Sequence, residues 1–120
     1  MKVIKSIAFA WQGLKICFTA ETNFRIHVLL GSIAVLLGFI LNVSKAEWGF
    51  IIFFIAFVIA MEMMNTAIEQ LCNVVRKETH LAIKNIKDIA AGAVMAAAAG
   101  SFITGLIIFL PKIIMFIKSV

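Results

Sequence analysis

The stretch Met61-Glu62-Met63-Met64-Asn65-Thr66-Ala67-Ile68-Glu69 carries acidic and amide side chains inside a long apolar segment that begins at Trp48. At about 100° per residue of an α-helix, its acids and amides fall on one face. They are Glu62, Asn65, Glu69 and, one turn further on, Asn73. A carboxylate at the centre of a bilayer costs about 2.5–3.5 kcal/mol. Such acids usually mark a functional site, and the alternative is hydrogen bonding between helices.

Composition points to the bilayer as the solvent of this chain. Of its 120 residues, 63% are hydrophobic and 14% are charged, and a chain of this length cannot bury so much apolar surface in a core of its own. We therefore predict a single membrane domain over residues 1–120. Basic residues flank the apolar segments and form no run, so the net charge of +5 predicts contact with anionic lipid headgroups and no binding of nucleic acid. The two cysteines lack metal spacing and are expected to be free and buried.

The apolar pattern predicts an all-α membrane protein with three transmembrane helices and an N-terminal amphipathic interfacial helix. Residues 2–19 place apolar side chains on one helical face and lysines on the other, with Trp11 at headgroup level. The transmembrane helices are predicted at residues 26–43, 47–75 and 89–110, the last closed by Pro111, with a loop over residues 76–88. Because the second helix exceeds the hydrocarbon thickness, Glu69 is expected in the headgroup layer and Glu62 about 10 Å deeper.

The distribution of Lys and Arg predicts the orientation in a bacterial cytoplasmic membrane. One side of the membrane receives eight of them: Lys2, Lys5, Lys15, Arg25, Arg76, Lys77, Lys84 and Lys87. The other side receives Lys45, Lys112 and Lys118. We therefore expect the amino terminus in the cytoplasm and the carboxyl terminus outside.

The predicted cytoplasmic face gathers acids, a lysine and a histidine, namely Glu21, Glu62, Glu69, Glu78, His80, Lys87 and Asp88. Carboxylates beside lysine suit Mg²⁺ and phosphate better than zinc. A carboxylate at headgroup depth can take the proton of a lipid hydroxyl, as phosphorylation of a lipid alcohol requires. The sequence contains no P-loop, protein-kinase glycine loop or DFG motif.

Plainer interpretations exist for the supporting residues. His80 in a polar loop is typical of a solvated histidine, and His27 is more typical of an interface residue than of a ligand. Lys87 and Asp88 are also compatible with a cap at the start of the third helix, since Asp favours a helix amino terminus.

The segment Glu62-x-x-Asn65-Thr66-Ala67-Ile68-Glu69 resembles the signature of the prokaryotic diacylglycerol kinase family, which are small integral membrane lipid kinases. The resemblance extends to residues 10–14 (AWQGL), 21–27 (ETNFRIH) and 87–94 (KDIAAGAV). It implies three transmembrane helices with an amphipathic amino-terminal helix, assembled as a homotrimer with active sites shared between subunits.

The resemblance also implies roles for the matching residues. Glu62 would be the catalytic base on the lipid hydroxyl, with Asn65 supporting its geometry. Glu21 and Glu69 would hold Mg²⁺, and Trp11 would lie with Glu62 along the lipid substrate. The ATP-binding set would be Glu21, Glu69, Glu78, His80, Lys87 and Asp88.

Three positions depart from the pattern that the resemblance implies. Asn73 stands where the family usually has Asp, and Phe9 and Thr79 stand where some members have Tyr. None of these positions is an implied metal ligand or the implied base, so they bear on efficiency rather than on the type of reaction.

Two substrates and two rival functions remain open at this point. The family phosphorylates diacylglycerol to phosphatidic acid or undecaprenol to undecaprenyl phosphate, and the wording of residues 23–27 and 90–94 resembles the undecaprenol branch more closely. One rival is a small proton-coupled transporter with Glu62 as the proton carrier, which has no use for Glu21 or Asp88. The other is a non-catalytic helical membrane partner, in which the acids bind neighbouring helices.

Overall fold

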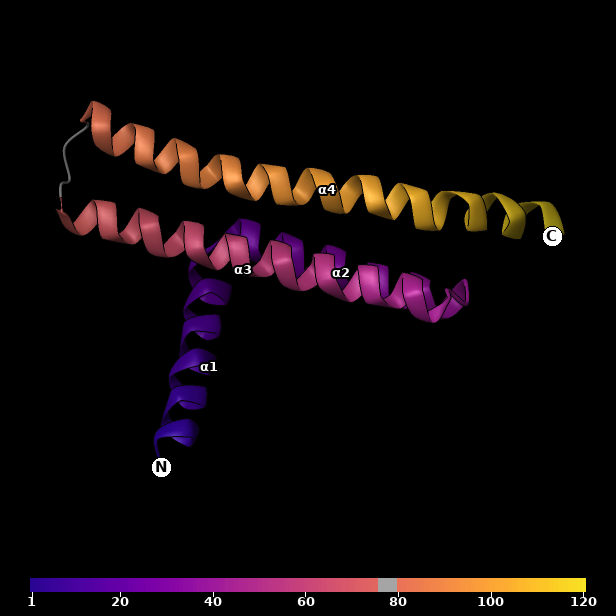
Figure 1. Cartoon of the computed structure of the whole chain (residues 1–120), viewed down its shortest axis with the longest axis horizontal. Helices are drawn as coiled ribbons and strands as arrows, with labels where there is room; N and C mark the ends of the chain where they lie inside the picture. The colour runs from indigo at the N-terminus through magenta and orange to yellow at the C-terminus, as the bar shows by residue number, and fades with distance from the viewer. Residues whose placement is uncertain (76–79) are drawn as a thin grey trace.

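The computed structural model describes residues 1–75 and 80–120, and these form helices with no strand. The helices are α1 (Lys2–Ala20), α2 (Thr22–Ile40), α3 (Lys45–Val75) and α4 (Leu81–Ser119). In Figure 1, α4 runs alongside α3, α2 lies behind α3, and α1 leaves the bundle sideways. The last three are long and apolar enough to cross a membrane. The prediction of an all-α membrane protein is therefore confirmed.

Helix α4 is longer at both ends than the predicted third span. Residues 81–88, predicted as loop, form its first two turns, because His80 caps the helix with its Nδ1 accepting from the Ala82 N–H at 3.2 Å. The predicted end at Leu110 was also wrong, since the helix continues through Pro111 to Ser119. Proline removes one helical hydrogen bond, but within an apolar segment the remaining backbone groups are best satisfied by continuing the helix.

Helix α2 ends at Ile40, three residues before the predicted end of the first span, because Asn42 adopts a left-handed conformation with a φ of 54°. The Val43 N–H then donates to the Gly38 carbonyl at 3.1 Å. This is the bond that closes a Schellman turn and satisfies a carbonyl at the helix end. The chain reverses there and enters α3.

The connection between α1 and α2 is a single extended residue, Glu21, with φ −117° and ψ 116°. Arg25 fixes this corner, because its Nη1 donates to the carbonyls of Phe18 at 2.8 Å and Thr19 at 3.2 Å. These carbonyls belong to the last turn of α1, where the helix supplies no partner for them. The direction of α1 is thus set by a side chain of α2, and Glu21 is held at the corner.

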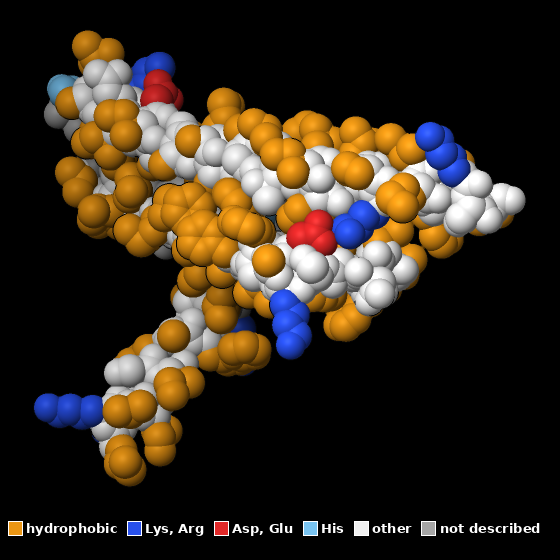
Figure 2. Space-filling view, turned by 45° about the vertical axis from the view of Figure 1, so that its right-hand side comes forward, with side chains coloured by type: hydrophobic (Ala, Val, Ile, Leu, Met, Phe, Trp, Pro, Cys, Tyr) orange, Lys and Arg blue, Asp and Glu red, His pale blue; other side chains and the backbone are white. Residues whose placement is uncertain are grey.

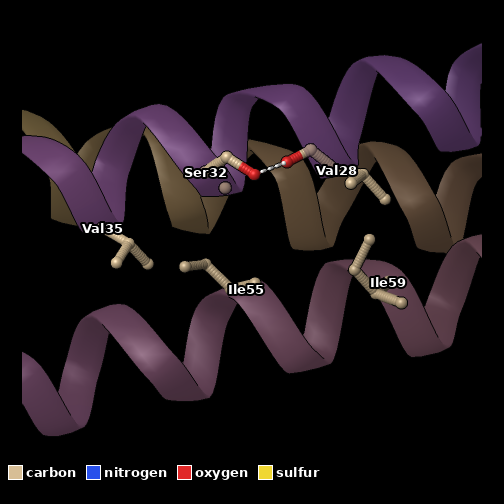
Figure 3. A pocket seen from close by; sticks show the side chains of 6 residues that line it. Val28, Ser32, Val35, Ile55 and Ile59 are labelled. Atoms are coloured by element: carbon tan, nitrogen blue, oxygen red, sulfur yellow. Dashed lines mark hydrogen bonds between the residues drawn. The ribbon is translucent and has the colours of Figure 1, made fainter.

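Large apolar side chains cover the outside of the long helices (Figure 2). Between α2 and α3 lies a shallow groove of about 370 Å³ lined by Val28, Val35, Ile55 and Ile59 (Figure 3). The one hydroxyl in it, that of Ser32, donates to the Val28 carbonyl at 2.9 Å. The groove is therefore apolar along its length, as expected for a surface that meets lipid.

Candidate active site

The site forms at the corner where α1, α2 and α3 meet, around the carboxyl group of Glu62. Glu62 is only 4% exposed, and its Oε1 lies 3.4 Å from Nε2 of His27 on α2. The carboxyl group therefore points into the protein and not toward lipid tails. The structure brings His27 to the centre of the site, whereas its sequence context had favoured a plain interface residue.

The polar face of α3 becomes progressively more exposed toward the carboxyl end of the helix. Glu62 is buried, Asn65 and Glu69 are half-buried, and Asn73 is exposed. The charges of Glu21, at the α1–α2 corner, and of Glu69 both act on Glu62. Glu62 is thus a buried carboxylate within the electrostatic range of two further acids.

Two buried oxygens beside Glu62 have no hydrogen-bond partner among the described residues, Asn65 Oδ1 and Thr66 Oγ1. Leaving a buried polar atom unpaired costs about 1–3 kcal/mol, and sites that retain this cost commonly serve a ligand or an ordered water. Thr66, which is 3% exposed, was not among the predicted site residues. Its spacing of four residues from Glu62 was the signal that places it on the same inward face.

Near the carboxyl end of α3, the start of α4 contributes two lysines and an acid. Lys87 Nζ donates to Asn73 Oδ1 at 2.7 Å, and Lys84 pairs with Asp88 at 2.6 Å. The suggestion that Lys87 and Asp88 cap the third helix is wrong, since they lie in its second turn and His80 is the cap. Their predicted contact with nucleotide stays a prediction.

His80 and Glu78 were also predicted to bind ATP, and only His80 lies in the described part of the chain. The His80 side chain is engaged by the Ala82 N–H, so the imidazole orients the start of α4. Glu78 lies outside the described residues, and its predicted role stays a prediction.

An apolar groove of about 470 Å³ leads along α1 toward this corner. Trp11 and Phe18 of α1, Phe24 and Val28 of α2, and Ile59 of α3 line it. Ile59 precedes Glu62 by three residues, so the two side chains lie on neighbouring positions of one helix face. The groove thus extends from the interfacial helix to within one helical turn of Glu62, and its lining includes the predicted lipid contact Trp11.

Both cysteines are free and buried, as predicted. Cys17 faces the corner from α1, and its burial raises the pKa of the thiol. A thiol with a raised pKa is a poor nucleophile at neutral pH, so Cys17 is a packing residue of the site.

Among residues 1–75 and 80–120, no group of three or more His, Cys, Asp or Glu side chains could hold a metal ion. Mg²⁺ is usually held by one or two carboxylates together with water and substrate phosphates, and seldom by protein ligands alone. The carboxylates of Glu21 and Glu69 have the right chemistry for such a shared ion. The donor set therefore fits Mg²⁺ that arrives with a nucleotide.

Comparison with known proteins supplies the family. The family described as prokaryotic diacylglycerol kinase matches residues 8–109. The chain belongs to this family. It is 36% identical over 112 residues to an undecaprenol kinase of Bacillus subtilis, covering 93% of this chain and 91% of that protein. It is 30% identical over 113 residues to a diacylglycerol kinase of Synechocystis, covering 93% of this chain and 65% of the relative.

A third relative is a diacylglycerol kinase of Haemophilus influenzae, 33% identical over 95 residues. It aligns with 79% of this chain and 80% of its own length. The prediction of a lipid kinase is confirmed by this membership. The three apolar helices and the family together also make the chain a multi-pass membrane protein.

Proposed function

We propose that this chain transfers the γ-phosphoryl group of ATP to the hydroxyl of a membrane lipid alcohol, with Mg²⁺ as cofactor. The observation that carries the proposal is the placement of Glu62, a carboxylate 4% exposed that lies one helical turn from Ile59, a lining residue of the apolar groove along α1. A lipid chain in that groove would bring its hydroxyl to the carboxylate. The acids Glu21 and Glu69 are more exposed than Glu62, and in this proposal they face the nucleotide.

In this mechanism Glu62 accepts the proton of the lipid hydroxyl as its oxygen attacks the γ-phosphorus and the bond to ADP breaks. The phosphorylated lipid and ADP leave, and Glu62 returns its proton to water. Asn65 and Thr66 present oxygens beside the carboxylate that have no partner among residues 1–75 and 80–120, and these suit a lipid hydroxyl or a water that orients it. The low exposure of the site limits access of bulk water, which would compete as acceptor.

Glu21 and Glu69 would hold Mg²⁺ together with the ATP phosphates. The bound ion would neutralise charge that develops on the transferred phosphoryl group. Lys87 and Asp88 contact the nucleotide in this proposal, with His80 and Glu78 at its binding loop. Lys87 reaches across to Asn73 at 2.7 Å, which positions its ammonium group at the open end of the site.

Undecaprenol is the substrate that we place first, and diacylglycerol is the second. The reason is the 36% identity to an undecaprenol kinase along 93% of this chain. Both alcohols present one hydroxyl at the membrane surface and apolar chains below it, so the groove beside Trp11 suits either headgroup.

We also propose a homotrimer with shared active sites, in a bacterial cytoplasmic membrane with the amino terminus inside and the carboxyl terminus outside. The orientation rests on the eight basic residues of one side against three of the other. Assembly is supported by small residues that α4 leaves exposed, among them Ala91, Gly92 and Ala99. A Cβ at Gly92 would meet nothing within 4 Å, and small exposed residues of this kind let helices of neighbouring subunits approach closely.

The direct test is a phosphate-transfer assay with purified protein in mixed micelles, using labelled ATP, Mg²⁺ and either undecaprenol or diacylglycerol. We expect labelled lipid phosphate with at least one alcohol and none without Mg²⁺. A proton-coupled transporter and a non-catalytic helical partner both predict no labelled lipid. The absence of transfer to any lipid alcohol with Mg²⁺ present would reject the proposal in favour of these alternatives.

A further inference from the structure

We infer that His27 is the positioning residue of the catalytic base, donating a hydrogen bond from Nε2 to Oε1 of Glu62 so that the second carboxylate oxygen faces the lipid hydroxyl. The inference rests on the proposed function, in which Glu62 is that base. It assigns a role to a residue of α2 that lies outside the nucleotide-binding set.

The geometry supports a dedicated contact. Nε2 and Oε1 lie 3.4 Å apart, and the side chains of His27 and Glu62 are 20% and 6% exposed. Of the described side chains, His27 is the one within ion-pairing distance of Glu62. Hydrogen bonds of catalytic groups are often long before substrate binds and shorten in the reacting complex. A separation of 3.4 Å is therefore suitable for a contact that tightens when the groove is filled.

The backbone around His27 is fixed by packing on both sides. Phe24, three residues earlier on the same face of α2, is 3% exposed and anchors the start of the helix at the corner. Arg25 ties that start to the last turn of α1 through the Phe18 carbonyl at 2.8 Å. Apart from its contact with Glu62, His27 lines an apolar pocket together with Val58 of α3 and Ala98 of α4. The imidazole thus has apolar walls and one acidic neighbour, which favours a single orientation.

Glu62 needs such a partner because it has two equivalent oxygens, and only one of them accepts the proton of the lipid hydroxyl. A carboxylate that rotates freely about its last bond spends part of its time with neither oxygen aimed at the substrate. Anchoring Oε1 leaves Oε2 available for the proton, and pre-organised geometry of this kind contributes to rate without changing substrate affinity. The role is therefore expected to show in kcat and not in KM.

The decisive comparison uses three replacements of His27. The amide nitrogen of Gln reaches about as far from the backbone as Nε2 of His, whereas that of Asn stops at the level of Nδ1. We expect His27→Gln to keep kcat within about threefold of wild type, and His27→Ala and His27→Asn to lower it about 10- to 100-fold, as for loss of a hydrogen bond to a charged group. KM for ATP and for the lipid should stay within about twofold. Ser32→Ala, on the same helix with its hydroxyl bound to its own backbone, is the matched control.

Gln and Asn are both polar amides and differ mainly in how far the amide nitrogen lies from the backbone. Comparing His27→Gln with His27→Asn therefore tests the position of the donor even if His27→Ala does not fold. Equal kcat for His27→Gln and His27→Asn would overturn the inference, as would wild-type kcat for His27→Ala. If wild-type protein transfers no phosphate to any lipid alcohol, the proposed function fails first and the positioning role fails with it. Active wild-type protein with an inert Glu62→Gln variant and an unaffected His27→Ala variant would remove the positioning role alone.

A second readout does not depend on turnover. The chain has two histidines, so ¹⁵N-histidine labelling gives two imidazoles in an NMR spectrum, and His80→Gln assigns them. Glu62→Gln should shift the Nε2 resonance of His27 and leave that of His80 in place. An unchanged His27 resonance would show that the contact is absent and would overturn the inference.

Discussion

The two ends of the α2–α4 bundle differ in how they treat polar groups. At the end where α2 meets α3, the Ser44 N–H donates to Glu47 Oε1 at 2.9 Å and the Glu47 N–H donates to Ser44 Oγ at 3.2 Å. This reciprocal pair is a capping box. Lys112 of α4 pairs with the same carboxylate at 3.3 Å, so Glu47 is held by a backbone N–H and by an ammonium group.

Beneath these polar contacts, that end is closed by apolar packing. Val43, Ile51 and Ile108 form a buried cluster covered in part by Trp48. The Trp48 ring lies so close to Gly38 that a Cβ on Gly38 would come within 2.5 Å of it. The helices are therefore in close apolar contact at this end.

The opposite end, around Glu62, leaves Asn65 Oδ1 and Thr66 Oγ1 buried and without a hydrogen-bond partner in the described part of the chain. Buried polar atoms without hydrogen bonds lower the stability of this end, and a bound ligand that bonds to them would restore that free energy. The end around Val43 (the closed end) thus holds the helices together, and the end around Glu62 (the open end) is available for chemistry. Substitutions at the open end should then change mainly kcat or KM, and substitutions at the closed end should change mainly the free energy of unfolding.

The largest expected effect is on turnover at the open end. Glu62→Gln should lower kcat about 10³-fold, since a positioned general base contributes about 10²- to 10⁴-fold. The matched control is Glu47→Gln, the same change at the other end of α3, which should keep kcat near that of wild type. Turnover in mixed micelles measures both. Full activity of Glu62→Gln would mean that this carboxylate is not the base.

The next effect concerns the nucleotide. Glu69→Ala and Glu21→Ala should each raise KM for ATP about 10- to 100-fold at fixed Mg²⁺, as for loss of a charged interaction, and leave KM for the lipid nearly unchanged. Gln70→Ala, the exposed neighbour of Glu69, is the control. A variant whose lipid KM alone changes would contradict the assignment of these acids.

At the closed end the expected effect is on stability. Gly38→Ala should lower the free energy of unfolding by about 1–3 kcal/mol, because a methyl group there overlaps the Trp48 ring and overpacking costs this much. Gly49→Ala meets nothing within 4 Å and should raise it by up to about 1 kcal/mol through helix propensity. Unfolding in detergent measures the two. Equal stability of both variants would show that Trp48 can move aside.

The smallest effect tests the unpaired hydroxyl. Thr66→Val keeps the shape of the side chain and removes Oγ1, so it should raise the free energy of unfolding by about 1 kcal/mol while lowering kcat. Val43→Thr, the reverse change at the closed end, should lower stability by about 1–3 kcal/mol. A Thr66→Val variant that loses stability would indicate that the hydroxyl has a structural partner.

Much of the architecture was predictable from the sequence because its signals are local. The helical periods, the lengths of the apolar segments and the polar face through Glu62 and Glu69 all depend on residues within a few turns of one another. The end of the last helix was predicted wrongly because proline is an ambiguous signal in an apolar segment. Pro111 normally ends a helix, yet α4 continues because an apolar segment has no better way to satisfy its backbone. His80 is exposed, as expected for a solvated histidine, and only the structure shows that it also caps α4.

The sequence by itself thus determined the class of protein, the number of long apolar helices and which residues could carry the chemistry. Family membership, read from motifs along residues 8–109, follows from the sequence as well. These properties need no knowledge of how the helices pack.

Only the tertiary structure decided which side chains meet. The contact of His27 with Glu62 at 3.4 Å joins residues 35 positions apart, and the bond from Lys87 to Asn73 joins two helices. Hydrophobic periodicity states which face of a helix is buried but not which partner covers it. Such contacts depend on helix directions that Arg25 and the Asn42 turn impose, and these are properties of the packed bundle.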